Sequence, residues 1–165
     1  MEPAFSPVQE SDYRHIRDIF NYYVENTTVT FATLRHTLND IKKDYPVSQN
    51  KYRTYMISYE GDIAGFCFLK PYKLRKAYDR TALIGVYLKP GYERMGIGSS
   101  ALGFLEKTAR DKNIKVLLGY ITAENNPSIR LVEKLGYVKC GHFRKIGEKF
   151  GRILDVVYYQ KKIAA

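Results

Sequence analysis

The stretch that decides the fold occupies residues 86–101 and reads VYLKPGYERMGIGSSA. A short β-branched and aromatic run leads into a turn, then into Gly-x-Gly, and then into the apolar spacing of a helix. Glycines let the chain curl so that successive backbone N–H groups converge, and the helix start adds unpaired N–H groups and the positive end of its dipole. We therefore expect a phosphate-bearing ligand to bind at this turn.

Length and composition set the class of protein. The chain has 165 residues, of which 45% are hydrophobic, so we expect one globular domain over residues 1–165. No apolar run reaches the ~18 residues that a membrane span needs, and the first residues lack the basic and apolar parts of a signal peptide. Cys67 and Cys140 lie in apolar runs and are predicted to be buried free thiols. We expect a cytoplasmic protein without a membrane partner or a metal site.

The charge balance is strongly basic. Lys and Arg number 27 against 17 Asp and Glu, which gives a net charge of +10. Such a chain attracts anions, although a solvated basic surface would give the same count. The charges are spread along the chain and form no block of five or six, so a nucleic-acid partner is not favoured.

Hydrophobic periodicity predicts alternating helices and strands. The expected helices cover residues 12–25, 38–44 and 96–112 and a segment that ends before Gly136; the expected strands cover residues 55–59, 63–69, 81–88, 116–121, 137–143 and 153–159. Ser11 is predicted to cap the first helix and Asn126 the last, where Pro127 suits the first turn. The pattern indicates a mixed α/β (α+β) fold with a largely antiparallel twisted sheet.

The glycine motif by itself leaves the ligand open. Gly96-x-Gly98-x-x-Ala101 matches the dinucleotide-binding fingerprint. That fold needs an acidic residue ~20 positions later, which falls near Leu117 and Leu118, and neither is acidic. The segment before the motif also indicates a hairpin instead of alternating strands and helices. A dinucleotide ligand is therefore disfavoured.

Three stretches in order carry a more specific resemblance. Residues 94–99 read RMGIGS, residues 124–137 read ENNPSIRLVEKLGY, and residues 147–157 read GEKFGRILDVV. Together they resemble GNAT N-acetyltransferases, most of all the phosphinothricin and methionine sulfoximine acetyltransferase branch, and residues 25–31 extend the likeness loosely. The resemblance covers nearly the whole chain. It implies one GNAT-like domain, with about six or seven strands and about four flanking helices.

The resemblance also implies a chemistry. In this family an amine attacks the thioester of acetyl-CoA directly, and the protein positions the reactants, takes the ammonium proton and stabilises the oxyanion. It places the pantetheine arm along Val86, Tyr87 and Leu88, with the Leu88 N–H as the oxyanion donor. The other implied cofactor contacts are Arg94, Met95, Gly96, Ile97, Gly98, Ser99 and Asn126. The expected acceptor is a primary amine of a small molecule, either amino-acid-like or cationic.

The departures from the branch fall on the substrate side. Leu83 stands where the branch has its presumed base, a Glu, and Asp79 stands where it has an Arg that would hold a substrate carboxylate. Val132 stands in a stretch that often carries a Tyr or His, the candidate acid. Glu93 opens the phosphate loop, where Gln or Arg is usual. The cofactor scaffold is thus expected to be retained without the usual acid and base.

Other residues are therefore candidates for the missing roles. Tyr87 shares a strand face with position 83, and Glu25 adjoins the loop expected to cover the substrate, so both are catalytic candidates. Each also has a structural interpretation, Tyr87 as a packing aromatic and Glu25 as a solvated charge. The substrate-binding candidates are Phe31, Tyr78, Asp79, Arg80 and Lys149. The charged segment 144–152 is expected to contribute a wall of the substrate site and the contacts of a homodimer.

Two alternatives remain open at this point. The chain could bind acyl-CoA as a regulatory module with little catalysis, because the usual acid and base are missing. It could instead acetylate an amine on a protein. The residues by themselves do not name the amine.

Overall fold

The computed structural model describes residues 1–47 and 50–164, which build one mixed sheet with helices on both faces. The strands are β1 (Ala4–Pro7), β2 (Thr54–Tyr59), β3 (Asp62–Pro71), β4 (Thr81–Leu88), β5 (Val116–Thr122), β6 (Val138–Lys149) and β7 (Arg152–Lys162). The helices are α1 (Tyr13–Asn26), α2 (Leu38–Asp44), α3 (Ile97–Asp111) and α4 (Asn126–Lys134), with short 3-10 helices at Glu10–Asp12 and Lys76–Tyr78. The predicted mixed α/β fold is confirmed.

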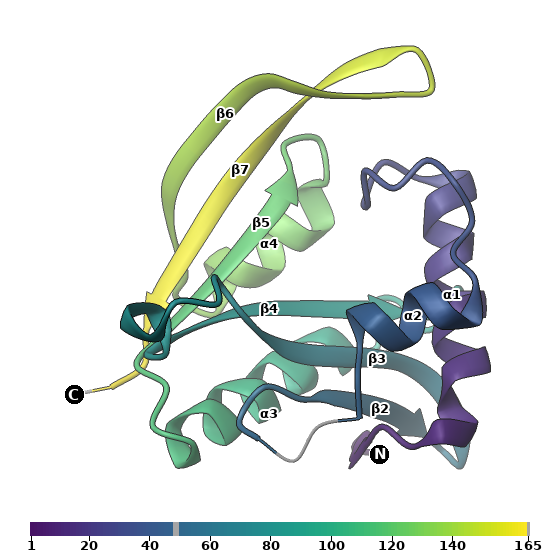
Figure 1. Cartoon of the computed structure of the whole chain (residues 1–165), viewed down its shortest axis with the longest axis vertical. Coiled ribbons are helices and arrows are strands. Elements are labelled where there is room, and N and C mark those ends of the chain that lie inside the picture. Colours follow the sequence, from purple (N-terminus) through teal and green to yellow (C-terminus); the bar gives the residue numbers. More distant parts are fainter. Residues whose placement is uncertain (48–49, 165) are drawn as a thin grey trace.

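The sheet divides between its two central strands. Its order is β1-β2-β3-β4-β5-β7-β6, and the β4–β5 pair is parallel while the other pairs are antiparallel. β4 and β5 pair only from Thr81–Val116 to Leu83–Leu118. Beyond that point β4 stays with β3 and β5 stays with β7, so the two strands diverge (Figure 1). The divergence leaves the facing edges of β4 and β5 unpaired with each other beyond Leu83 and Leu118.

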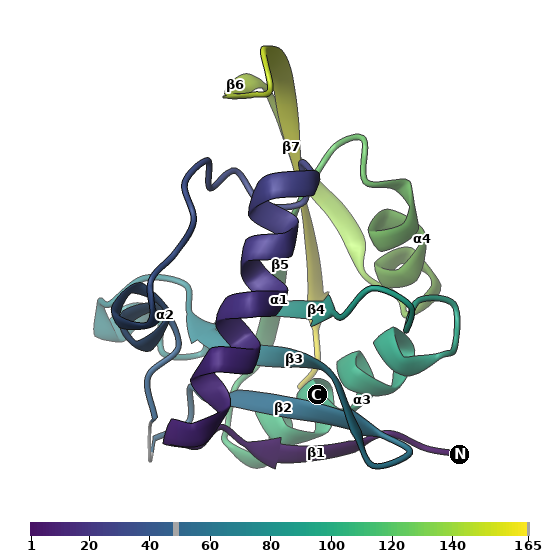
Figure 2. The ribbon, with the colours of Figure 1, turned by 90° about the vertical axis from the view of Figure 1, so that its right-hand side faces the viewer.

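Helices cover both faces of the sheet, as Figure 2 shows, with α1 and α2 on one face and α3 and α4 on the other. β2 and β3 therefore bury the side chains that point to either face of the sheet, which explains their nearly continuous apolar sequences. Met56 and Phe66 pack with α1 and α2. Ile57, Cys67 and Leu69 pack with α3. None of the described helices, which lie within residues 1–47 and 50–164, has the length and hydropathy needed to cross a membrane.

Both predicted helix caps are wrong. Ser11 lies inside the 3-10 helix that precedes α1. The cap of α4 is Asn125, whose side chain accepts from the Ser128 N–H at 3.4 Å, while Asn126 is the first helical residue. Adjacent asparagines offer the same side chain at both positions, so only the backbone conformation decides between them.

At the edges of the sheet, the sequence missed one strand and misjudged one cysteine. β1 was not expected, because its four residues are mostly exposed and contain Pro7, and only pairing with β2 makes them a strand. Cys140 was expected to be buried but is exposed, while Cys67 is buried, and both thiols are free. Cys140 lies on β6, the edge strand of the sheet, whose side chains are mostly exposed.

The β6–β7 hairpin is longer than the sequence indicated. Its strands continue through the charged segment to a turn at Phe150 and Gly151, both of which have positive φ. Charged side chains do not end a strand that water can reach, so the pattern underestimated its length. The hairpin, yellow-green to yellow in Figure 1, projects beyond the rest of the sheet.

Candidate active site

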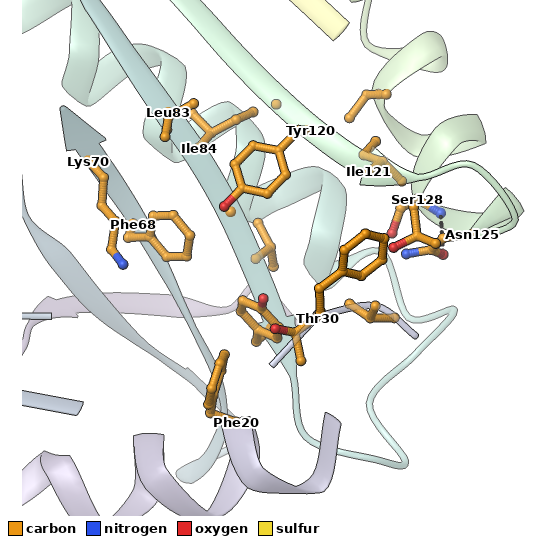
Figure 3. A pocket seen from close by; sticks show the side chains of 18 of the residues that line it. Phe20, Thr30, Phe68, Lys70, Leu83, Ile84, Tyr120, Ile121, Asn125 and Ser128 are labelled. Atoms are coloured by element: carbon orange, nitrogen blue, oxygen red, sulfur yellow. Dashed lines mark hydrogen bonds between the residues drawn. The ribbon is translucent and has the colours of Figure 1, made fainter. Parts of the chain in front are cut away.

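A cavity of about 490 Å³ lies where β4 and β5 diverge (Figure 3). β4 lines it with residues 83–87 and β5 with residues 119–122. Phe20 of α1 and Tyr45, which follows α2, line it from one side of the sheet, while Leu102 of α3 and Val132 of α4 line it from the other. The cavity therefore passes through the sheet, and ligands on opposite faces can meet inside it.

The two faces of β4 differ in kind. Val86 and Leu88 pack into the cluster that contains α3, whereas Tyr87 packs with α1. Gly85 shares the Tyr87 face, and a Cβ at this position would lie 2.1 Å from the Phe68 ring. Only glycine lets that ring lie against the strand. The α1 face of β4 is thus an aromatic surface, and the α3 face is aliphatic.

Tyr87 lies at the centre of the aromatic surface. Its ring stacks on Phe66 with centroids 5.2 Å apart and meets the edges of Phe20 at 5.7 Å and Tyr23 at 5.3 Å. Burial raises the pKa of Tyr87 well above its ordinary value. The phenol therefore stays protonated, so it suits a proton donor and not the general base.

The carbonyl at the end of β4 is held by a half-buried phenol. The Tyr23 hydroxyl donates to the Leu88 carbonyl at 2.6 Å. Burial raises the pKa of Tyr23 to about 12, so this donor keeps its proton at neutral pH. This hydrogen bond holds the carbonyl of Leu88 in place. The strand that ends at Leu88 is the one predicted to meet the pantetheine arm.

Residues 27–32 form a roof over the cavity, which they line with residues 29–32. The Thr122 hydroxyl donates to the Thr28 carbonyl at 2.6 Å, and the Thr28 hydroxyl donates to Glu124 at 2.5 Å. Arg152 donates to both oxygens of Glu124, at 3.1 and 2.5 Å. The hydrogen bonds from Arg152 and Thr28 lower the pKa of Glu124. One carboxylate thus joins the roof to the hairpin.

Lys149 also holds this roof. The residue is buried, and its Nζ donates to the carbonyl of Thr30 at 2.8 Å and to that of Tyr23 at 3.5 Å. Burial lowers its pKa. Phe31 packs so closely on Gly147 that a Cβ there would lie 2.2 Å from its ring. Phe31 lines the cavity and Lys149 does not, so the structure places Lys149 as a support of the roof.

The predicted phosphate loop has the backbone that such a site needs. Arg94 and Gly96 have positive φ, and Gly96 precedes the first residue of α3. The first N–H groups of a helix have no partner within it, so those of residues 97–99 are available to an anion. The Glu93 carboxylate would repel phosphate, but it accepts a hydrogen bond from the Gly91 N–H at 2.8 Å. The carboxylate is therefore held against the turn that precedes the phosphate loop.

Several predicted residues lie outside the cavity lining. Glu25 forms an ion pair with Arg35 on the surface. Tyr78 packs on Tyr72 with ring centroids 5.2 Å apart, and the Asp79 carbonyl accepts from the Tyr52 hydroxyl at 3.3 Å. Arg80 is exposed at the start of β4, and the exposed Asn126 is replaced in the lining by Asn125. Their roles in binding or catalysis stay predictions, whereas Val86, Tyr87 and Phe31 do line the cavity.

The lining residues that the sequence analysis did not single out include Lys70 of β3 and Tyr120 of β5. Both point into the cavity in Figure 3. The alternation of Phe66, Phe68 and Lys70 along β3 places the lysine on the aromatic face, which is a signal that the sequence contains. Tyr120 follows Gly119 in an apolar run and gives no such signal. Within residues 1–47 and 50–164, no three His, Cys, Asp or Glu side chains gather as a metal site would require.

The sequence model of the acetyltransferase (GNAT) family matches residues 16–137. The chain belongs to this GNAT acetyltransferase family. A phosphinothricin N-acetyltransferase from Streptomyces viridochromogenes is 34% identical over 155 residues, which are 94% of this chain and 85% of the relative. An L-methionine sulfoximine/L-methionine sulfone acetyltransferase from Salmonella typhimurium is 25% identical and covers 93% of this chain and 91% of its own.

Solved structures agree with this GNAT fold. A GNAT superfamily phosphinothricin acetyltransferase from Sinorhizobium meliloti, in complex with acetyl-CoA, superposes with a TM-score of 0.92 at 23% identity. The match covers 98% of this chain and 89% of that one. The predicted likeness to the phosphinothricin and methionine sulfoximine branch is therefore confirmed.

Proposed function

We propose that this GNAT acetyltransferase transfers an acetyl group from acetyl-CoA to the primary amine of a small molecule, amino-acid-like or cationic, by direct attack on the thioester. The observation that carries the proposal is the cavity through the sheet at the β4–β5 divergence. The acetyl donor would lie against α3 and α4, and the amine would enter beneath residues 27–32. The two would meet in the cavity at β4. Holding two reactants in line supplies much of the acceleration.

The donor side fits acetyl-CoA. The unpaired N–H groups that follow Gly96 suit the diphosphate, because glycine and a left-handed Arg94 let the loop curl at the positive end of α3. Val86 and Leu88 offer a strand edge and an aliphatic surface to the pantetheine arm. Acetyl-CoA supplies the thioester. Cys67 is buried and burial raises the pKa of its thiol, which disfavours a covalent intermediate on that residue.

The acceptor side supports a small amine. Two relatives are named as acetyltransferases of phosphinothricin and of methionine sulfoximine, and both of these substrates are small amines. Lys70 and Asp44 are the charged residues among those that line the cavity in the described structure. Tyr87 is proposed as the proton donor to the departing thiolate. Glu25 would act on the amine only through water, because it lies outside the lining.

A homodimer is the proposed assembly, within which residues 1–165 act as one N-acetyltransferase domain. The β6–β7 hairpin carries exposed apolar side chains at Val138, Phe143, Ile146, Phe150 and Ile153. Such a patch marks an interaction surface on a soluble chain. Light scattering of wild type and Phe143→Asp tests it, and a monomeric wild type would contradict the dimer. We place the protein in the cytoplasm, where free thiols such as Cys67 and Cys140 persist.

Calorimetry with acetyl-CoA tests the donor site. Gly98→Glu adds a carboxylate at the start of α3, and its Cβ would lie 3.0 Å from Leu131. We expect affinity to fall about 100-fold or more, because the charge repels the diphosphate. The matched control is Gly103→Glu on the same helix, where nothing lies within 4 Å of the added Cβ. Equal affinities in both variants would contradict a diphosphate site here.

Release of free thiol tests the transfer itself. The acceptors are phosphinothricin, methionine sulfoximine, L-amino acids, spermidine, kanamycin and a peptide with a free N-terminus. Turnover with a small amine supports the proposal, and turnover with the peptide alone favours a protein substrate. Leu83 and Val132 favour a second candidate, an acyl-CoA-binding module, because neither side chain can carry a proton. Tight binding without thiol release from any acceptor would replace the proposed function by that candidate.

A further inference from the structure

Lys70 occupies the place beside the missing base. It is the antiparallel partner of Leu83, the position where the resembling branch carries its glutamate. Directly opposed residues in an antiparallel pair extend on the same face of the sheet. Both residues line the cavity, and Figure 3 shows the Lys70 amine directed into it beside the Phe68 ring.

Aromatic rings surround the Lys70 amine. Its Nζ lies 3.8 Å from the centroid of the Tyr45 ring and 4.9 Å from that of Phe68. In the described structure, the Lys70 Nζ has neither an ion pair nor a hydrogen-bond acceptor. An ammonium has three donors, so this surrounding leaves all of them to a ligand or to water.

The titratable groups that share the cavity come from three other parts of the fold. They are Asp44 and Tyr45 from the end of α2, Tyr87 from β4 and Tyr120 from β5. Burial raises the pKa of Tyr45 and of Tyr87, so both phenols stay neutral. The Asp44 carboxylate lies 3.5 Å from the His36 Nε2. Burial lowers the pKa of Lys70 to about 8, although the charge of Asp44 opposes this effect.

We propose that Lys70 is the general base of the acetyl transfer and replaces the carboxylate that Leu83 lacks. The inference rests on the proposed function. The neutral Lys70 amine takes one proton from the substrate ammonium, directly or through one water, and becomes an ammonium. The freed amine forms the C–N bond and the C–S bond breaks. Tyr87 donates its phenolic proton to the departing thiolate and takes up the proton that the new amide nitrogen loses. Lys70 then returns its proton to water.

The surroundings of Lys70 suit both of its protonation states. The apolar, partly buried position keeps about a tenth of the amine neutral at pH 7, given the pKa of about 8. The ring faces of Tyr45 and Phe68 stabilise the ammonium that forms in the transfer. A base that titrates close to the working pH is the effective kind.

Lys70→Arg separates a base from a site that merely binds an anion. Arginine keeps the positive charge but cannot accept a proton at neutral pH. With phosphinothricin as acceptor, or the fastest acceptor of the screen if that is inert, we expect Lys70→Arg and Lys70→Met each to lower kcat about 100-fold or more. Acetyl-CoA affinity stays unchanged in both. If Lys70→Arg keeps its kcat while Lys70→Met raises KM, Lys70 binds an anion and the proposal is wrong.

The pH profile gives a readout that a structural role would not move. In wild type, kcat/KM rises with pH through a midpoint of about 8, because the neutral amine is the active form. In Lys70→Met this limb is absent, and only the titration of the acceptor itself remains. The control is Lys107→Met on the exposed face of α3, which keeps the wild-type profile. A limb unchanged in Lys70→Met overturns the proposal.

A rescue variant tests the geometry. Leu83→Glu in the Lys70→Met background restores a base at the paired position, and we expect kcat to recover about ten-fold. A double variant no faster than Lys70→Met contradicts the need for a base at this point of the sheet. The two proposals fail separately. A wild type that releases no thiol refutes the proposed function, whereas equal turnover by wild type and Lys70→Met refutes only the role of Lys70.

Discussion

The two faces of β4 differ in composition, and the proposed reaction assigns the donor to one face and the acceptor to the other. Toward α3, aliphatic Val86 and Leu88 lead to a glycine turn and a helix start, which would hold the donor by backbone N–H groups. Toward α1, the surface consists of aromatic rings and one lysine, which come from β3, β4, α1 and α2. The proposed donor side would depend on backbone conformation and the proposed acceptor side on side chains. Substitution can therefore change the acceptor chemistry while the donor site stays.

The largest expected effect comes from the centre of the aromatic face. Phe66 is fully buried and stacks on Tyr87. We expect Phe66→Ala to lower the free energy of unfolding by about 3–5 kcal/mol, because the ring leaves a cavity between the sheet and α1. Urea unfolding measures it. Phe104→Ala, on the α3 side and only partly buried, should cost less. A larger loss for Phe104→Ala would reverse the comparison.

Gly85→Val fills the aromatic face instead of emptying it. The added Cβ would lie 2.1 Å from the Phe68 ring, which must move into the cavity. We expect a loss of about 1–3 kcal/mol in the free energy of unfolding together with a raised KM for the amine. The acetyl-CoA affinity should change little, because the α3 face of β4 keeps its residues. Gly103→Ala, in open space on α3, serves as control and should stabilise the helix by roughly 0.5–1 kcal/mol.

Lys70→Met should stabilise the protein. The folded-state pKa of Lys70 is lowered to about 8, so at neutral pH the unfolded chain binds this proton more tightly than the folded one. We expect a gain of about 1–2 kcal/mol at pH 7, since the ring contacts offset part of the desolvation cost. The gain shrinks as pH rises from 8 to 10.5, where wild type regains stability. A variant that unfolds more easily at pH 7 would show that Lys70 is structural.

The smallest expected effect concerns the roof. Glu124→Gln weakens the link between residues 27–32 and Arg152, and we expect under about 1 kcal/mol because the pair is exposed. The pKa of Glu124 is lowered, so its contribution is present above pH 4.5 and is lost as pH falls below that value. The amine KM should rise while the acetyl-CoA affinity holds. Glu148→Gln on β6 is the control, and a change in acetyl-CoA affinity alone would argue against a roof.

The sequence predicted most of the fold, and the donor half of the site stays the prediction that the sequence made. β4 ends where expected, because β-branched residues lead into a Pro-Gly turn. α2 also matches, since Thr37 and Asp40 form a capping box and Pro46 follows. β1 and the far half of the β6–β7 hairpin were missed, because pairing and not local preference makes these exposed segments strands.

The acceptor half could not be predicted in the same way. Glu25 was chosen from its place along the chain, but its partner Arg35 holds it outside the cavity lining. Lys149 was expected at the substrate; in the fold it is buried, its amine donates to the Thr30 carbonyl, and it does not line the cavity. Lys70 was not singled out from the sequence at all. Each of these outcomes depends on contacts between segments far apart in the chain.

By itself the sequence determined the glycine turn, the helix behind it and the family, because these depend on backbone conformations that particular residues permit locally. Only the tertiary structure decided that β4 and β5 part after Leu83 and Leu118, and that Lys70 opposes Leu83. Strand register and burial arise from contacts across the whole sheet. A charge gains or loses its proton according to those contacts, so the chemistry of the acceptor side emerges only with the fold.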